Sequence, residues 1–412
     1  MKVFFARNFI VSLLIFFLLL FVVIYILYSQ LSIKNLLHPS LNFLESETNT
    51  YTLKNLKKVS YGFLPYWSIG DFNYDFSTLT DLAYFTIALN SDGTIKKIDP
   101  ETGNLDPSYN TWSNSSKLKD ILQKSRESGV RNTITIAIHD NDSIEKFLNC
   151  NTCWVTSYKA LNTEVKNNFI LGLNFDFEYV GDPIDNIDLK YTEYITYLSK
   201  KFKSDYGKNF LIVVSVYADS AIKSRLMNID SLNTNDIDYL FIMAYDFYRP
   251  TSSTSGPVAP IGGSPQKYEY DITSTNIDYL AKISPGKLIL GLPFYGYNWI
   301  VESYEPYSAR VDGNDYTGYS ISQHYSAIKE KIESESIDVL WDEDAKSPYF
   351  SYYNEDTGVI RQVFFENQKS IQEKVDFAQK NNYAGVGIWA LGYTGGDTQL
   401  FLPIEKYLSI DN

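Results

Sequence analysis

The chain has 412 residues, of which 44% are hydrophobic and 16% are aromatic. This aromatic content is too high for a disordered or low-complexity chain, so we expect a folded protein. The formal net charge of −13 would repel a nucleic-acid backbone over most of the surface, which argues against nucleic acid as a partner.

An apolar segment, residues 1–28, precedes everything else in the chain. Phe9 to Tyr28 is uncharged and long enough to cross the hydrocarbon core of a bilayer. Lys2 and Arg7 before it favour a cytoplasmic N-terminus with the rest of the chain exported. Because no small-x-small cleavage site follows, we expect an uncleaved anchor and a single-pass membrane protein. Cleavage would instead give a secreted protein.

Residues 29–57 are predicted to form a stalk, and residues 58–412 the main domain. In the main domain, short apolar runs alternate with segments long enough for a helix, which is the pattern of parallel strands buried on both faces. Eight strands are predicted: Val59–Phe63, Leu82–Leu89, Thr133–Ile138, Phe169–Glu178, Phe210–Tyr217, Tyr239–Tyr245, Lys287–Pro293 and Gly385–Ala390. Helices are predicted, for example, at Ser116–Ser128, Leu189–Lys203 and Ser370–Asn381.

Eight βα units favour a closed (β/α)8 TIM barrel, an α/β fold, over an open doubly wound sheet, since no glycine-rich phosphate loop follows the first strand. About ninety residues separate the seventh strand from the eighth, and they include many tyrosines and a helix-like run, Ser320–Glu333. We therefore expect a small α+β insertion at about residues 300–368. Barrel active sites lie at the C-terminal ends of the strands, so the insertion would wall one side of the cleft.

The chain contains only two cysteines, Cys150 and Cys153. Outside the cytoplasm a short structural disulfide is the simplest interpretation. A redox pair would need the motif at the start of a helix that follows a strand, whereas this pair lies between two helix-like segments. A zinc site lacks ligands, because His38, His139 and His324 are scattered and none forms a spaced pair with the cysteines.

The fourth predicted strand carries the clearest sign of chemistry. Side chains alternate between the two faces of a strand, which places Asn174, Asp176 and Glu178 together on the side that faces the barrel interior. Two buried carboxyl groups within three positions are costly without a reason. Glu178 would lie at the open end of the barrel, within reach of a substrate. The alternative is an internal polar network with no reaction.

The run Leu171 to Glu178 resembles the signature of glycoside hydrolase family 18, Asp-Gly-x-Asp-x-Asp-x-Glu, with Gly172, Asp176 and Glu178 matching. Leu171 and Asn174 stand where the family has aspartates. The resemblance implies that Glu178 is the general acid and that Asp176 orients the 2-acetamido group of the substrate. Asn174 cannot share a proton with Asp176, which implies a reduced rate or an altered pH profile.

Further runs carry the resemblance over most of the main domain. Met243-Ala244-Tyr245-Asp246 resembles the family's Met-x-Tyr-Asp, whose tyrosine and aspartate contact the acetamido group and the sugar. Four runs are similar to the bacterial branch that includes spore cortex-lytic and muropeptide-trimming N-acetylglucosaminidases: Gly256–Pro260, Gly291–Trp299 on strand seven, Val363–Asn367 and Gly387–Gly392.

The resemblance implies a floor for the −1 subsite at Trp389, although plain core packing is the alternative. The same alternative holds for Tyr245, Tyr295 and Tyr297. The candidate substrate-binding residues are Asn174, Asp246, Trp389, Tyr295, Tyr297 and Tyr66. Tyr66 and Trp67 line outer subsites or cover the barrel mouth, and His139 is expected to support or pack rather than to catalyse.

The family resemblance implies a glycosidase that cleaves β-1,4 bonds of N-acetylglucosamine-containing glycans, either chitin oligomers or peptidoglycan. It further implies retention by substrate-assisted catalysis through an oxazolinium intermediate, with Glu178, Asp176 and Tyr245 as catalytic residues and no cofactor or metal. We also expect a monomer. The alternative is a glycan-binding protein on the same fold that has lost catalysis, which Leu171 and Asn174 motivate.

Overall fold

The computed structural model describes residues 52–54, 56–72, 76–100 and 102–409. Residues 51–201 and 209–412 form one compact unit. The predicted membrane anchor and most of the predicted stalk lie outside the described residues and stay predictions. Among the helices of the described part, none is both long and apolar enough to cross a membrane.

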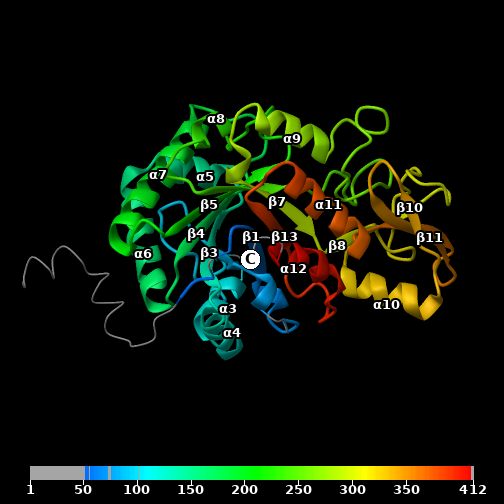
Figure 1. The fold of residues 1–412 in the computed structure, drawn as a ribbon, viewed down its shortest axis with the longest axis horizontal. Coiled ribbons are helices and arrows are strands. Elements are labelled where there is room, and N and C mark those ends of the chain that lie inside the picture. The colour runs from blue at the N-terminus through cyan, green and yellow to red at the C-terminus, as the bar shows by residue number, and fades with distance from the viewer. Residues whose placement is uncertain (1–51, 55, 73–75, 101, 410–412) are drawn as a thin grey trace, which may run out of the picture. The chain divides into compact units, whose positions relative to one another are not determined.

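Eight parallel strands close into a barrel in the order β1-β13-β7-β6-β5-β4-β3-β2 (Figure 1). The barrel strands are β1 Val59–Pro65, β2 Asp81–Ala88, β3 Arg131–Ile138, β4 Gly172–Phe177, β5 Leu211–Tyr217, β6 Tyr239–Met243, β7 Leu288–Pro293 and β13 Gly385–Trp389. Each overlaps one of the predicted strands, so the predicted barrel is confirmed. The apolar alternation predicted them because both faces of a barrel strand are covered, one by the interior and one by helices.

Helices lie on the outside of the barrel (Figure 1). They are α3 Pro107–Asn114, α4 Ser116–Glu127, α5 Asn141–Leu148, α6 Asn151–Asn167, α7 Ile187–Tyr206, α8 Ile229–Leu232, α9 Ile272–Leu280, α11 Gln368–Lys380 and α12 Leu402–Ser409. Short 3-10 helices occupy Tyr66–Ser68, Phe76–Thr78, Pro285–Lys287 and Gln399–Phe401. Side-chain caps begin several helices, since Asp106, Asp140 and Asn367 each accept a hydrogen bond from a backbone N–H of the first turn. The three predicted helices are confirmed within about three residues at each end.

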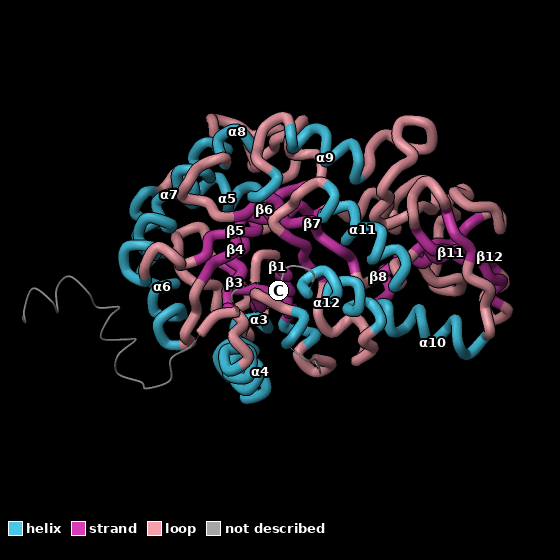
Figure 2. Tube along the Cα trace, viewed as in Figure 1, coloured by secondary structure: helices cyan, strands magenta, loops and turns pink. Residues whose placement is uncertain are grey.

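The insertion is an antiparallel sheet in the order β10-β11-β12-β8-β9. Its elements are β8 Tyr295–Val301, β9 Ile321–His324, α10 Tyr325–Glu335, β10 Leu340–Asp342, β11 Ser347–Asn354 and β12 Val359–Phe364. Figure 2 shows β11 and β12 as a group of strands apart from the barrel, with β8 between the two groups. The predicted α+β insertion is confirmed, and it begins at Tyr295 rather than near residue 300.

Two local predictions in this region were wrong. The helix predicted from Ser320 begins only at Tyr325, because Ile321–His324 pairs with β8 as the edge strand β9. The run Gly291–Trp299, placed on strand seven, is divided between β7 and β8 at Phe294. Cross-strand pairing outweighed the local periodicity in both places.

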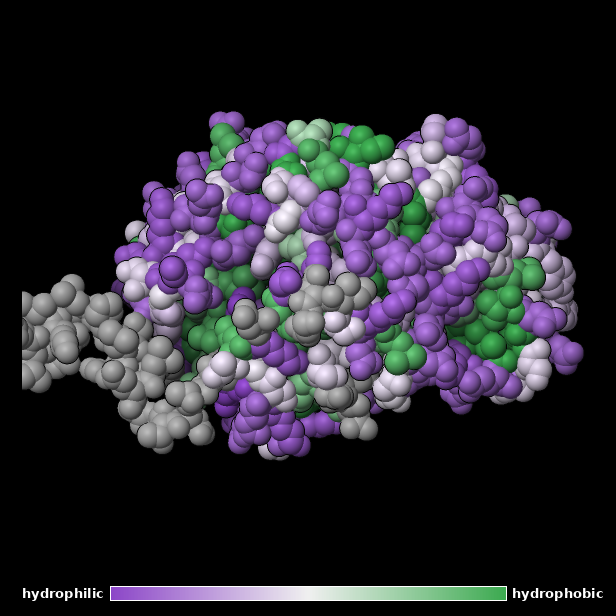
Figure 3. Space-filling model, in the orientation of Figure 1, coloured by the Kyte–Doolittle hydropathy of each residue, from purple (hydrophilic) through white to green (hydrophobic). Residues whose placement is uncertain are grey.

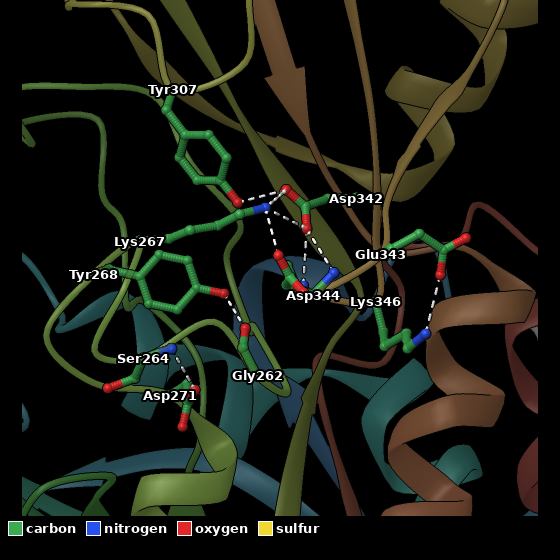
Figure 4. A network of polar contacts seen from close by, with 11 residues as sticks. Gly262, Ser264, Lys267, Tyr268, Asp271, Tyr307, Asp342, Glu343, Asp344 and Lys346 are labelled. Carbon is green, nitrogen blue, oxygen red and sulfur yellow. Dashed lines mark hydrogen bonds and ion pairs between the residues drawn. The ribbon is translucent and has the colours of Figure 1, made fainter.

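A polar network ties the insertion to the loop between β6 and α9 (Figure 4). Lys267 on that loop lies 3.1 Å from Asp342 Oδ2 and 2.9 Å from Asp344 Oδ2, and the Tyr307 hydroxyl donates to Asp342 Oδ2 at 2.6 Å. Burial alone would raise the pKa of Asp342, but hydrogen bonds from Ala345 N–H, Tyr307 and Lys267 outweigh it and lower that pKa. The network holds the insertion against one rim of the barrel.

A disulfide joins Cys150 and Cys153, with an S–S distance of 1.97 Å, so the structural interpretation of the pair is confirmed. Cys150 is the N-cap of α6 and lies just after α5, as the predicted position between two helices required.

On the face shown in Figure 3 the surface is largely hydrophilic with scattered hydrophobic patches, in keeping with the net charge of −13.

Candidate active site

Strand β4 places three polar side chains in a row along the barrel interior. Asn174 is fully buried and Asp176 is 4% exposed, whereas the Glu178 side chain, one residue beyond the strand, is 44% exposed. The Glu178 N–H donates to Ile138 O of β3 at 3.2 Å, which anchors the residue at the mouth. The predicted inward direction of this face is confirmed.

The other face of β4 packs on the outer helices. Phe175 and Phe177 lie against tyrosines of α7, with ring centroids 6.0 Å apart for Phe175 and Tyr194 and 5.3 Å apart for Phe177 and Tyr191. Gly172 begins the strand where a Cβ would come within 2.9 Å of Thr133 and 2.8 Å of Leu211. The glycine of the motif therefore lets β3 and β5 approach β4 at the bottom of the site.

Asp176 is held in a state that favours its protonated form. Burial, and secondly the nearby Glu178 charge, raise the pKa of Asp176 to about 8, against a smaller lowering by a hydrogen bond with Ser215. Its Oδ1 atom has no hydrogen-bond partner among the described residues. At neutral pH Asp176 is thus largely neutral, with a proton to donate and an Oδ1 atom that can still accept a hydrogen bond.

Asn174 lies deeper in the barrel than Asp176 and bonds to the neighbouring strands. Its Nδ2 donates to Ser215 Oγ at 3.1 Å and lies 3.5 Å from Thr135 Oγ1, while Ser215 Oγ donates to Asn174 Oδ1 at 3.3 Å. Because the side chain is fully buried, any effect of Asn174 on a substrate would be indirect.

Tyr245 and Asp246 follow β6 at the mouth. Burial, then the charges of Asp176, Asp246 and Glu178, raise the pKa of Tyr245 well above its usual range, so its hydroxyl stays protonated. Asp246 has a left-handed backbone, with φ 61°. Its Oδ1 accepts hydrogen bonds from the hydroxyls of Tyr295 and Tyr297, the latter at 2.5 Å.

Tyr295 and Tyr297 reach this position from β8 of the insertion and not from strand seven. Their rings are 5.6 Å apart, and the Tyr295 ring is 6.2 Å from the Tyr245 ring. Both tyrosines are buried, at 4% and 6% exposure. The Asp246 carboxyl group therefore joins the insertion to the end of β6.

Trp389, at the end of β13, forms part of an aromatic surface in the barrel mouth. Its ring is 4.8 Å from Phe85, 5.7 Å from Phe63 and 6.4 Å from Trp67. Trp67 is 46% exposed, and its neighbour Tyr66 is partly buried. Trp389 packs on the core cluster and still keeps a partly exposed side chain, and its role as the floor of a −1 subsite stays a prediction.

This aromatic surface continues to residues that the sequence did not single out. Trp67 Nε1 donates to the Tyr393 hydroxyl at 3.3 Å, and the Tyr393 ring stacks on His324 of β9 at 3.7 Å. Desolvation lowers the pKa of His324, against an opposing effect of Asp71, so the ring is largely neutral at pH 7. Only its place at the junction of β9 and α10 brings His324 to the rim.

Glu178 has one neighbour on each side. The Tyr217 hydroxyl donates to Glu178 Oε2 at 3.4 Å, and His139 Nδ1 lies 3.8 Å from Glu178 Oε1. His139 is therefore an exposed neighbour of Glu178 rather than a packing residue. Sequence reasoning missed Tyr217, although its place as the last residue of a predicted strand was a usable signal. Among the described residues, no cluster of three or more His, Cys, Asp or Glu side chains could hold a metal ion.

Comparisons with known proteins find several relatives of this chain. A protein named "Probable di-N-acetylchitobiase 1" of Dictyostelium discoideum is 30% identical over 259 residues, which cover 57% of this chain and 66% of that protein. The cortical fragment-lytic enzyme of Bacillus anthracis is 23% identical over 329 residues, 76% of this chain and 65% of that enzyme. The chain thus spans less than two thirds of the length of these curated relatives.

A solved structure shares the fold. The family 18 chitinase of Cycas revoluta in complex with (GlcNAc)3 superposes with a TM-score of 0.69 at 18% identity, covering 85% of this chain and 99% of the chitinase. The sequence profile of the family named Glycosyl hydrolases family 18 matches residues 33–394. This match covers far more than half of the chain, and the relatives include a bacterial cortex-lytic enzyme, so the chain belongs to glycosyl hydrolase family 18, as its motifs indicated.

Proposed function

We propose that the protein is a glycosidase that cleaves β-1,4 bonds of N-acetylglucosamine-containing glycans with retention of configuration. The observation that carries the proposal is the pairing of a half-exposed carboxyl group, Glu178, with the buried and largely protonated Asp176. A double displacement with an enzyme nucleophile needs a second ionised carboxylate facing the anomeric carbon. Asp176 does not fit that role, because its charge is suppressed.

In the proposed first step the substrate supplies the nucleophile. Glu178 donates its proton to the glycosidic oxygen as the bond to the anomeric carbon breaks. The acetamido carbonyl oxygen of the −1 sugar bonds to the same carbon from the opposite face, which gives an oxazolinium ion. Asp176 and the protonated hydroxyl of Tyr245 hold the acetamido group in place for this attack.

In the second step Glu178, now a carboxylate, takes a proton from a water molecule. The hydroxide oxygen bonds to the anomeric carbon, and the bond to the acetamido oxygen breaks. Two inversions give net retention, and Glu178 regains its proton. We assign the stacking surface for the −1 sugar to the partly exposed Trp389. The remaining polar contacts with the glycan are assigned to Asp246, Tyr295, Tyr297 and Tyr66.

The relatives point to two substrate classes. The chitobiase-like and chitinase relatives suggest chitin oligomers, and the cortical fragment-lytic enzyme suggests peptidoglycan. Both polymers carry the 2-acetamido group that the proposed mechanism uses, so the site geometry suits either of them.

Incubating the protein with N-acetylglucosamine oligomers and, separately, with purified peptidoglycan tests the proposal. We expect shortened products by mass spectrometry and an initial β-anomer by proton NMR. An initial α-anomer would contradict substrate assistance. Tight binding without any product would favour the glycan-binding alternative, for which Asn174 in place of the family's aspartate is the specific observation.

Restoring an acid at position 174 gives a related expectation. In Asn174→Asp the new carboxyl group faces Ser215 and Thr135 and can share a proton with Asp176. We expect kcat to rise by about three- to tenfold, on the order of 1 kcal/mol of barrier, with a changed pH profile. Steady-state kinetics between pH 4 and pH 9 measures both, and Ser199→Ala, a buried serine of α7, controls for core substitution. An unchanged profile would remove Asn174 from the catalytic argument.

A further inference from the structure

Strands β3, β4 and β5 lie side by side in the barrel (Figure 1). Three side chains meet at the ends of these strands. Glu178 follows β4 directly and makes a different contact through each carboxyl oxygen. Tyr217 of β5 donates to Oε2 at 3.4 Å, and His139 after β3 stands 3.8 Å from Oε1. The family motifs that carry the resemblance include neither Tyr217 nor His139.

The Tyr217 ring is itself held in place from two directions. The Arg225 guanidinium lies 4.7 Å from its centroid, and Asp219 binds that guanidinium through both oxygens at 2.7 and 2.8 Å. The Tyr279 hydroxyl donates to the backbone carbonyl of Tyr217 at 2.5 Å. Because its ring and its backbone are both held, the Tyr217 hydroxyl can orient the carboxyl group to which it donates.

We propose that Tyr217 is a positioning residue for the acid, whose hydroxyl holds Oε2 of Glu178 so that the carboxyl group keeps one orientation in the cleft. This inference rests on the proposed function, because it gives Glu178 a proton to deliver. Tyr217 touches the acid and not the reacting atoms. Its effect therefore passes through the direction and the charge of the Glu178 carboxyl group.

The groups that face Glu178 come from several strands. Besides Tyr217 they are Asp176 on β4, His139 after β3, Tyr245 after β6 and, behind the Tyr217 ring, Arg225. Burial, then the charges of Glu178 and Asp176, raise the pKa of Tyr217 well above its usual range, with Arg225 opposing them. The hydroxyl therefore stays protonated, and remains a donor, over the whole pH range in which an enzyme of this kind would be assayed.

The variant Tyr217→Phe removes only the hydroxyl and keeps the ring under Arg225. We expect kcat to fall about tenfold with KM nearly unchanged, since a misdirected acid affects chemistry more than binding. A hydrogen bond to a carboxylate stabilises its charged form, so we also expect the high-pH limb of kcat/KM to move up by at least about half a pH unit. The same shift is expected in a His139→Gln background, because the two contacts use different carboxyl oxygens.

A matched control is Tyr194→Phe. This variant also loses a buried hydroxyl, which is bonded to Ser157 at 3.1 Å in the parent. The Tyr194 ring, however, packs on Phe175, on the face of β4 that points away from the barrel interior. The kcat and pH profile of this variant should equal those of the parent. If Tyr217→Phe fails to fold, Arg225→Lys keeps a charge beside Asp219 while it releases the ring, and a smaller shift in the same direction is expected.

A titration that needs no turnover separates this inference from the proposed function. In the full chain labelled with carbon-13 at the glutamate carboxyl groups, the Glu178 signal is assigned by its loss in Glu178→Gln. Its titration midpoint should move upward in Tyr217→Phe. A parent that cleaves no glycan while the midpoint moves would refute the proposed function and leave the contact established. Equal midpoints in parent and variant would overturn the inference, whether or not the parent turns over.

Discussion

Glu178→Gln is expected to lower kcat by about 10³- to 10⁴-fold, because in the proposed mechanism the same carboxyl group serves as acid in the first step and as base in the second. Glutamine has nearly the same shape and keeps an oxygen towards Tyr217 or His139, so the fold and the cleft should persist. Half of the side chain is in solvent, so the loss of charge should change stability little.

Steady-state kinetics measures the loss of turnover in Glu178→Gln, and calorimetric titration with an N-acetylglucosamine oligomer measures its glycan binding. The dissociation constant should stay within a few fold of the parent value while turnover is lost. Glu193→Gln on the exposed side of α7 makes the same chemical change outside the barrel, and it should leave kcat as it is. Turnover that survives Glu178→Gln would end the assignment of the acid.

Asp176→Asn is expected to lower kcat by about 10²-fold and, at the same time, to stabilise the fold at high pH. The loss of activity follows from the proposed mechanism, in which the protonated carboxyl group of Asp176 holds the acetamido group, because the variant replaces that carboxyl group with an amide. Glycan binding should weaken less than kcat falls. Kinetics and binding measured on one preparation separate these effects.

The gain in stability follows from the raised pKa of Asp176. The folded state keeps the Asp176 proton up to about pH 8, whereas an aspartate in an unfolded chain loses it near pH 4. Between these values the folded state binds more protons than the unfolded state, so the free energy of unfolding falls as the pH rises. Asparagine does not titrate, so the free energy of unfolding of the variant lacks this decrease with pH.

Urea unfolding of parent and variant at pH 4, 6 and 8 measures how the difference in their free energies of unfolding changes with pH. The advantage of Asp176→Asn should be small at the lowest pH and largest at the highest. Asp376→Asn on the exposed side of α11 should show no such trend. A variant whose advantage shrinks as the pH rises would show that Asp176 is charged in the folded protein.

The sequence alone determined the barrel and the direction of its central polar row. Period-two alternation in Gly172–Phe177 is a local property, and it decided which side chains face inward before any neighbour was known. The spacing of Asp176 and Glu178 along one face followed from the same period. Likewise, only two cysteines occur in the chain, and their separation allowed a short bridge.

Only the tertiary structure decided which side chains lie beside the carboxyl groups of the site. Tyr217 and His139 reach Glu178 because β5 and β3 flank β4 in a closed parallel barrel, and lateral neighbours depend on register between strands far apart in the chain. Tyr295 and Tyr297 reach Asp246 only because β8 leaves the barrel and opens the antiparallel sheet. The same long-range pairing made a strand of Ile321–His324, where the local pattern favoured a helix. Local periodicity reports which face of an element is buried, whereas contacts across the site come from pairings that no single segment encodes.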